Sequence, residues 1–311
     1  MTTNSETSSH DKSENKSEKK EQVISKSEEK TCKYCNLVLS GGSVKGIAHV
    51  GALNVLVEKG LIDLKKLESV AGTSAGSMLG LLIVLGFTTD EVRDFLYELD
   101  ISSMFNPDLS LVLKKCGIET GQTVCRMFED ILYERTRVKH INFRQLFEIT
   151  GIHFIVVGSC LTTKEAVYYD HLNTPNFKVS MAIRISIGIP GFFTPVAIGS
   201  NRYIDGGVIN DYPMNLFVDR LDKTVGILIN NEFSTEYSCP EEYFMAIISL
   251  FFYRYYNKSA EQWADNTVCI KHTMDNINML SFDIDYDSKV KLYEAGENAA
   301  LDFINKKQLA D

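Results

Sequence analysis

Gly72-Thr73-Ser74-Ala75-Gly76 lies between two apolar segments of the chain. Leu67–Ala71, which precedes it, predicts a short buried strand, and Met78–Leu85, which follows it, predicts a buried helix. A serine at a strand-to-helix turn carries its hydroxyl away from the sheet and beside the first amides of the helix. Gly72 and Gly76 suit such a turn because its backbone is strained and other segments pass close to it. The pentapeptide makes Ser74 a candidate nucleophile, although ordinary turns also carry this pattern.

A second glycine-rich turn lies upstream. Asn36–Ser40 predicts a buried strand, Gly41-Gly42-Ser43-Val44-Lys45-Gly46 follows it, and Ile47–Leu56 predicts a helix. Backbone amides in such a loop can bind a phosphate or form an oxyanion hole. Ser43 breaks the dinucleotide-binding pattern, and Lys45 precedes the last glycine instead of following it as in a Walker loop. The oxyanion hole and a tight turn without a ligand remain open.

A third motif lies far downstream. Within Arg202–Val208, Asp205 ends a short predicted strand and is followed by Gly206 and Gly207. By itself, Asp-Gly-Gly is typical of a hairpin turn. It gains meaning only together with the two earlier motifs.

The three motifs, in this order, resemble the patatin-like phospholipase family. The resemblance covers 36–215 and includes further similar text at Gly117–Gly121, Asn142–Leu146, Ile185–Val196, Asn210, Tyr212 and Pro213. The family usually has a third glycine at the position of Ser43. A positive φ at a residue with a Cβ atom costs about 1–2 kcal/mol, so this departure affects the geometry of the loop.

The resemblance implies a serine–aspartate dyad, with Ser74 as the nucleophile and Asp205 as the proton acceptor that later activates water. It implies that the developing oxyanion is held by the amides of Gly41, Gly42, Ser43 and Val44. Further positions support these motifs, namely Lys45, Gly46, Gly72, Gly76, Gly206 and Gly207. An ordinary aspartate has a pKa near 4 and is a weak base for a hydroxyl, so we expect burial to raise the pKa of Asp205.

The activity that the resemblance implies is hydrolysis of a carboxyl ester in a phospholipid or lysophospholipid, through an acyl-Ser74 intermediate. Neither a metal ion nor a cofactor is expected. Three alternatives remain open: an acyltransferase that uses the same dyad, a lipid-binding protein without catalysis, and an esterase with a Ser-Asp-His triad. The triad order points to His272, whereas His49 is expected to be a packing residue behind the glycine loop.

The remaining pattern predicts an α/β fold. Ile152–Gly158 and Thr224–Asn230 are two further apolar segments that predict strands, and helices alternate with them. Continuous apolar strands are buried on both faces, which predicts a mostly parallel central sheet between two helix layers, the patatin-like three-layer fold. In such sheets ligands bind beyond the carboxyl ends of the strands, where Ser74 and Asp205 lie.

Composition divides the 311 residues into two parts. Residues 1–31 are rich in Ser, Lys and Glu and predict a disordered tail, and 32–311 predict the catalytic domain. The net charge of −9 argues against nucleic acid as a partner. Seven cysteines in a domain with a full core, and the lack of a signal peptide, predict a cytoplasmic protein with reduced thiols.

Two segments are candidates for contact with lipid. Ile101–Cys116 is an apolar connection that suits a lid over an acyl pocket, although a packed connector has the same pattern. Tyr243–Tyr253 contains no charge and ends in aromatic residues, which suits either peripheral contact with a membrane or a buried helix. Many members of the family need an activating protein partner, and none is identified by these residues.

Overall fold

The computed structural model describes residues 32–229, 243, 246, 247, 250, 256–271 and 284–309. These residues all belong to the second of the two units into which the chain divides, Cys32–Asp311. The predicted tail, 1–31, lies outside the described residues.

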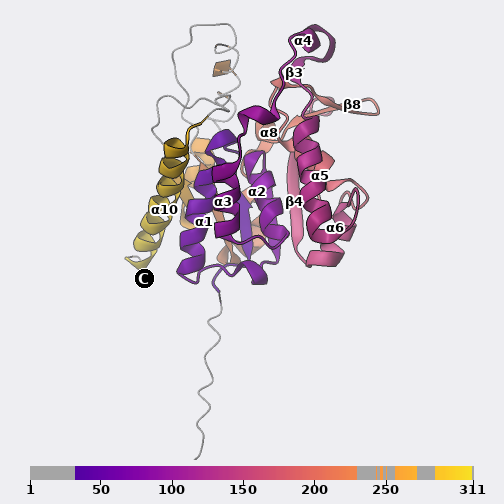
Figure 1. Ribbon diagram of the computed structural model, residues 1–311. Helices are drawn as coiled ribbons and strands as arrows, with labels where there is room; N and C mark the ends of the chain where they lie inside the picture. Colours follow the sequence, from indigo (N-terminus) through magenta and orange to yellow (C-terminus); the bar gives the residue numbers. More distant parts are fainter. Residues whose placement is uncertain are drawn as a thin grey trace, which may run out of the picture. The chain divides into compact units, whose positions relative to one another are not determined.

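A central sheet of eight strands organises the described part of the second unit (Figure 1). Its strand order is β10-β9-β1-β2-β4-β8-β7, and β5 pairs with β4 off this path. The strands from β10 to β4 are all parallel, whereas β5 and β8 run antiparallel to β4. The bounds are β1 Asn36–Leu39, β2 Ser69–Thr73, β4 His153–Cys160, β5 Glu165–Tyr169, β7 Val196–Ile198, β8 Asn201–Asp205, β9 Thr224–Ile229 and β10 Thr267–Ile270. The prediction of a mostly parallel sheet is confirmed.

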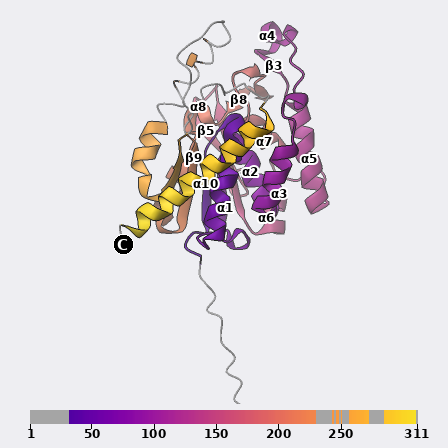
Figure 2. The ribbon, with the colours of Figure 1, turned by 60° about the vertical axis from the view of Figure 1, so that its left-hand side comes forward.

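Helices connect these strands and cover the sheet (Figures 1 and 2). The α-helices are α1 Ile47–Glu58, α2 Ala75–Val84, α3 Thr89–Glu98, α4 Ser110–Lys115, α5 Gln122–Thr136, α6 Phe143–Thr150, α7 Val179–Ser186, α8 Gly207–Asn210 and α10 Tyr286–Gln308. The 3₁₀ segments are η1 Ser43–Gly46, η2 Leu64–Lys66, η3 Ser102–Met104, η4 Pro213–Lys223 and η5 Ala264–Asn266. A separate two-stranded sheet pairs β3 Gly117–Glu119 with β6 Gly191–Phe193.

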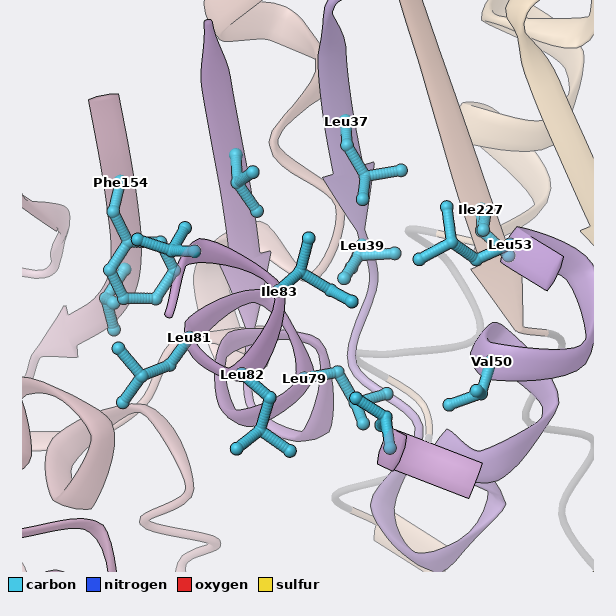
Figure 3. Close-up of a cluster of buried hydrophobic side chains, with 14 of the residues drawn as sticks. Leu37, Leu39, Val50, Leu53, Leu79, Leu81, Leu82, Ile83, Phe154 and Ile227 are labelled. Carbon is cyan, nitrogen blue, oxygen red and sulfur yellow. The ribbon is translucent and has the colours of Figure 1, made fainter. Parts of the chain in front are cut away.

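The core lies on both faces of the sheet because successive side chains of a strand point to opposite faces. Leu37 and Leu39 of β1 belong to a cluster that includes side chains of α1 and α2 (Figure 3). Val38, between them, belongs to a second cluster with Met214 and Phe217 of η4. The apolar strands are therefore buried on both faces, which confirms the predicted three layers.

One feature of the sheet positions the candidate site: β2 and β8 share one edge of β4. The parallel strand β2 ends with Thr73 paired to Val157, and the antiparallel strand β8 ends with Asp205 paired to Gly158. The strand β5 occupies the opposite edge of β4. Since Val157 and Gly158 are consecutive, β2 and β8 meet end to end. Ser74, the next residue after β2, is thereby brought beside Asp205.

The last hundred residues extend the fold beyond the region of the family resemblance. The strand β10 adds an edge to the sheet, and α10 packs against α1. These helices touch through glycines: a Cβ atom on Gly51 would collide with the backbone oxygen of Tyr293, and one on Gly296 would collide with that of Ala48. The two helix backbones are therefore in direct contact.

This contact predicts that Gly296→Ala destabilises the protein, although a glycine-to-alanine change inside a helix is usually stabilising. Alanine is favoured over glycine inside a helix by about 1 kcal/mol. The added methyl group must nevertheless displace the backbone of α1, and overpacking of this kind costs about 1–3 kcal/mol. We expect a lower free energy of unfolding in urea titrations. Asn298→Ala, at an exposed position of the same helix, is the control and should not be destabilised; a stabilised Gly296→Ala protein would contradict the packing.

Candidate active site

Ser74 occupies the strained turn that the sequence predicts. Its φ and ψ are 51° and −122°, it directly precedes α2, and its side chain is largely buried. The Ser74 amide donates a 2.9 Å hydrogen bond to Ser186 Oγ. The Ser74 carbonyl accepts a 2.6 Å hydrogen bond from Ser77 Oγ. Local contacts on both sides thus hold the backbone of Ser74 in a conformation that a residue with a Cβ atom rarely adopts.

Gly72 and Gly76 are required by close approach of backbone segments. A Cβ atom on Gly72 would collide with the backbone oxygen of Gly76. A Cβ atom on Gly76 would collide with the backbone oxygens of Leu39 and Ser40, at the end of β1. The turn is therefore pressed against the strand that leads into the glycine loop. These close approaches leave no room for a side chain at either position.

Asp205 is buried at the end of β8, with 1% of its surface exposed. Its Oδ1 accepts a 2.7 Å hydrogen bond from the Gly207 amide. Among the described residues, Oδ2 has no hydrogen bond of ordinary length and angle, yet the Ser74 hydroxyl lies near enough to favour the charged carboxylate. Burial outweighs both neighbours and raises the pKa of Asp205 from 3.8 to about 7. A carboxylate with this pKa is a better base at neutral pH than a solvated aspartate.

Asp211 is a second buried carboxyl group close to Asp205. Burial and, to a smaller extent, the charge of Asp205 raise the pKa of Asp211 from 3.8 to about 8, while the Gly41 amide lowers it. Its Oδ1 has no hydrogen-bond partner among the residues described. Two carboxyl groups in one buried site resist ionising together. The pair therefore holds a proton near neutral pH, and Asp205 is the member of the pair that lies beside Ser74.

The glycine loop lies against the turn that carries Ser74. A Cβ atom on Gly46 would lie 3.1 Å from that of Ala75, so the two segments are in contact. Ser43 has a φ of 49°, the left-handed conformation that a third glycine would adopt without strain. Lys45 is 5% exposed, so its side chain does not project into solvent.

One of the four amides predicted for the oxyanion hole is already engaged. The Gly41 amide donates a 3.1 Å hydrogen bond to the Asp211 carbonyl oxygen, so Gly41 is removed from the predicted set. The Gly42 amide has no acceptor among the described residues. Ser43 and Val44 line the same pocket as Ser74. Gly42, Ser43 and Val44 therefore carry the oxyanion proposal.

The sequence analysis singles out two histidines, of which His49 is described by the structure and His272 is not. His49 is 1% exposed beneath the glycine loop, where burial lowers its pKa to about 3. A neutral, buried His49 fits the packing residue that the sequence predicts. His272, the candidate for a triad, lies outside the described residues. Most of Tyr243–Tyr253 lies outside them as well.

Ser74 lines an apolar pocket of about 940 Å³, a volume that includes space open to solvent. Its polar lining residues are Ser43, Ser74 and Lys289. The Lys289 ammonium donates hydrogen bonds of 3.0 and 2.8 Å to the carbonyl oxygens of Tyr97 and Leu99, at the end of α3. The remaining lining is aliphatic and aromatic and includes Leu82, Leu96, Leu99, Met104, Phe128 and Phe193. Such a pocket suits an acyl chain.

Met104 also belongs to Ile101–Cys116, the segment with the pattern of a lid. Ile101 and Phe105 of this segment line the pocket as well. The beginning of the segment therefore forms part of the pocket wall. Its remainder, from residue 106 to 116, is almost entirely exposed.

Two residues of the site were missed by sequence reasoning. Ser186 holds the Ser74 amide through its side chain and accepts a weaker hydrogen bond, 3.4 Å, from the Gly206 amide through its carbonyl oxygen. Asp211 holds Gly41. Ser186 and Asp211 lie in segments whose sequence resembles that of the family, Ile185–Val196 and the stretch after Asp205. Nothing in the sequence distinguishes the two residues from their neighbours.

In the described part of the chain, no group of three His, Cys, Asp or Glu side chains is arranged to bind a metal ion. Over the same ranges, no helix is both long and apolar enough to cross a bilayer.

Comparison with known proteins identifies the family of the chain. The family described as Patatin-like phospholipase matches residues 37–218, more than half of the chain. Protein R571 of Acanthamoeba polyphaga mimivirus is 29% identical over 274 residues, which cover 84% of this chain and 90% of the viral protein. A probable lipid hydrolase, 463L of Invertebrate iridescent virus 6, is 26% identical over 86% of this chain and 88% of its own. YqhO of Bacillus subtilis is 31% identical over 63% of this chain and 71% of its own.

Two solved structures share the fold. VipD from Legionella pneumophila has a TM-score of 0.61 at 16% identity, over 88% of this chain and 67% of VipD. ExoU from Pseudomonas aeruginosa, solved in complex with SpcU, has a TM-score of 0.52 at 17% identity, over 88% of this chain and 53% of ExoU. The chain belongs to the patatin-like phospholipase family, and this membership supports lipid hydrolase activity.

The buried carboxyl group predicts that Asp205→Asn stabilises the protein at alkaline pH. Because the folded state raises the pKa of Asp205 from 3.8 to about 7, it binds the proton more tightly than the unfolded state. Wild-type stability therefore falls as the pH rises through that interval. Asparagine is neutral throughout, so we expect a gain on the order of 1–3 kcal/mol at about pH 8 and none at about pH 4. Urea unfolding of the wild type and of Asp205→Asn at both pH values measures this gain. Equal stabilities of the two proteins at pH 8 would contradict a buried charge at Asp205.

Proposed function

We propose that the protein is a lipid acyl hydrolase that cleaves a carboxyl ester of a phospholipid or lysophospholipid through a Ser74–Asp205 dyad. The observation that carries this proposal is the meeting of Ser74 with a buried carboxyl group beside an apolar pocket. Family membership and the similarity to a probable lipid hydrolase support the substrate class.

In the first step, Ser74 Oγ attacks the carbonyl carbon of the ester, and its proton passes to the carboxylate of Asp205. The carbonyl oxygen becomes an oxyanion, which the amides of Gly42, Ser43 and Val44 stabilise. The tetrahedral intermediate collapses as the bond to the alcohol breaks, and Asp205 returns the proton to the leaving oxygen. The acyl group then remains on Ser74 as an ester.

In the second step, a water molecule attacks the acyl-Ser74 ester, and Asp205 accepts the proton of the water. Collapse of the second intermediate releases the fatty acid and returns the proton to Ser74 Oγ. A base with a pKa near the working pH suits both steps, because it accepts a proton and then releases it. The acyl chain occupies the apolar pocket during both steps, with its carboxyl end at Ser74.

Labelling by a fluorescent fluorophosphonate tests the dyad without a known substrate. This reagent forms a bond only with an activated serine, so we expect labelling of the wild type and none of Ser74→Ala or Asp205→Asn. Asp211→Asn is the matched control, because it replaces a neighbouring buried carboxyl group to which the proposal gives no role as a base. We expect Asp211→Asn to be labelled at a rate within about tenfold of the wild type.

Two outcomes would contradict the proposal. Folded wild-type protein that stays unlabelled even after addition of a cell extract would indicate a protein without catalysis, whereas labelling that needs the extract would indicate an activating partner. A folded His272→Ala variant that is neither labelled nor active would replace the dyad by a triad.

The pocket predicts a variant with altered preference for chain length. Leu96 lies in α3 and lines the pocket, so Leu96→Trp fills part of the space for the acyl chain. We expect kcat/KM for a p-nitrophenyl palmitate to fall by about tenfold or more, whereas that for the butyrate ester changes little. Ile149→Trp, at an exposed position on α6, is the control. Equal losses for both esters would place the acyl chain elsewhere.

A further inference from the structure

Residues 106–116, called the arm below, form a projection between the pocket and β3. The arm contains α4, and both views show α4 and β3 beyond the ends of α3 and α5 (Figures 1 and 2). In the arm, every residue except Leu111 is exposed. The family motifs of the sequence lie outside it.

The arm exposes large apolar side chains on one side of a short helix. Leu113 is 96% exposed, Leu109 is 76% exposed and Val112 is 42% exposed. Leu109 has helical φ and ψ, so positions 109, 112 and 113 have the spacing of one helix face. Contiguous apolar residues at the tip of a projection mark an interaction surface.

Backbone hydrogen bonds hold the base of the arm in place. The apolar side chains could fold back onto the protein only if these hydrogen bonds broke. The Asp108 amide donates a 2.7 Å hydrogen bond to the Ile118 carbonyl oxygen. The Asn106 amide donates a 2.8 Å hydrogen bond to Glu119 Oε2. The strand β3, which follows the arm, is paired with β6.

The charges of the arm favour an anionic partner. Lys114 and Lys115 directly follow Leu113 and are exposed. Within the described ranges neither lysine forms an ion pair with an acidic side chain. Asp108 is the sole acidic residue of the arm, and its carboxylate accepts a hydrogen bond from the Ser110 amide. The arm is thus cationic on a chain whose net charge is −9.

The arm is continuous with the pocket that Ser74 lines. Phe105 directly precedes the arm and lines that pocket together with Met104. The Phe105 ring makes edge-to-face contacts with Phe192 and Phe193, at centroid distances of 5.3 and 5.7 Å. A surface that binds the arm therefore lies next to the residues that line the pocket.

We propose that the arm docks the protein on anionic phospholipid bilayers, with Leu109, Val112 and Leu113 inserted among the lipids and Lys114 and Lys115 at the headgroups. Apolar side chains beside lysines are the composition of interfacial anchors. The role of the docking, which is delivery of the lipid substrate to the pocket, rests on the proposed function. The binding itself does not require hydrolysis.

Flotation with diether phospholipid vesicles tests the docking, because these lipids contain no carboxyl ester. Vesicles of phosphatidylcholine with phosphatidylserine should carry wild-type protein, and the Leu109→Glu, Leu113→Glu double variant should bind at least about tenfold more weakly. Leu172→Glu, at a residue that is 68% exposed outside the arm, is the control and should bind as the wild type does. Lys114→Glu, Lys115→Glu should weaken binding to these vesicles more than to phosphatidylcholine alone. Unchanged binding by the leucine variant, or no binding by the wild type, overturns the proposal.

Insertion is measured separately with Leu113→Trp and vesicles of phosphatidylserine with brominated phosphatidylcholine. The bromine atoms should quench the added tryptophan, whereas Leu172→Trp should show no quenching beyond that of Trp263 in the wild type. No added quenching at position 113 overturns the proposal. If the leucine variant alters the oligomeric state of the wild type without altering vesicle binding, the arm is an interface between copies of the chain instead.

Turnover of soluble p-nitrophenyl butyrate distinguishes this inference from the proposed function. The leucine variant should retain turnover within about twofold of the wild type, because the arm contributes none of the residues that react. A wild type that binds vesicles but never turns over an ester refutes the proposed function and leaves the docking supported. A leucine variant that is folded but loses the soluble activity overturns the docking as the role of the arm.

Discussion

The site depends on two strands that meet end to end on one edge of β4. Because β2 is parallel and β8 is antiparallel to β4, their carboxyl ends coincide at Val157 and Gly158. This register places Ser74 beside Asp205 without a contribution from any flexible loop. The glycines around the turn are then required, because the turn is pressed against the end of β1. The loop that follows β1 is consequently held over the same point. The position of the glycine loop therefore depends on the turn, and the position of the turn depends on the register of the sheet.

Burial gives the carboxyl groups of the site their chemistry and makes them a source of instability. Burial raises the pKa of Asp205 to about 7 and that of Asp211 to about 8, so both groups favour their neutral forms in the fold. Ionisation of Asp205 costs folding free energy and in return supplies a base near neutral pH. Asp211 spans the two halves of the site, because its backbone oxygen binds the Gly41 amide and the charge of Asp205 raises the pKa of its side chain. The positive φ angles of Ser43 and Ser74 likewise cost folding free energy at positions that serve the site.

Local pattern predicted the parallel strands, the serine turn and the glycine loop, because hydrophobic period and glycine placement act over a few residues. Order along the chain and resemblance then linked Ser74 to Asp205. The antiparallel side of the sheet, Ser186 and Asp211 were not predicted, since their roles arise from contacts between segments distant in sequence. Gly41 shows the same limit, because no local pattern reveals that its amide is engaged. The apolar text of Ile101–Cys116 suggested a lid, and only the structure divides it into a pocket wall and an exposed arm.

The most direct test of the account is to capture the covalent intermediate. The protein is mixed with a long-chain p-nitrophenyl ester, quenched in acid within the first turnover, digested with trypsin and examined by mass spectrometry. The account predicts an acyl group on the peptide that contains Ser74, in the wild type and not in Asp205→Asn. An acyl group on another residue, or product release by a folded wild type with no acylated peptide at any time, would contradict it.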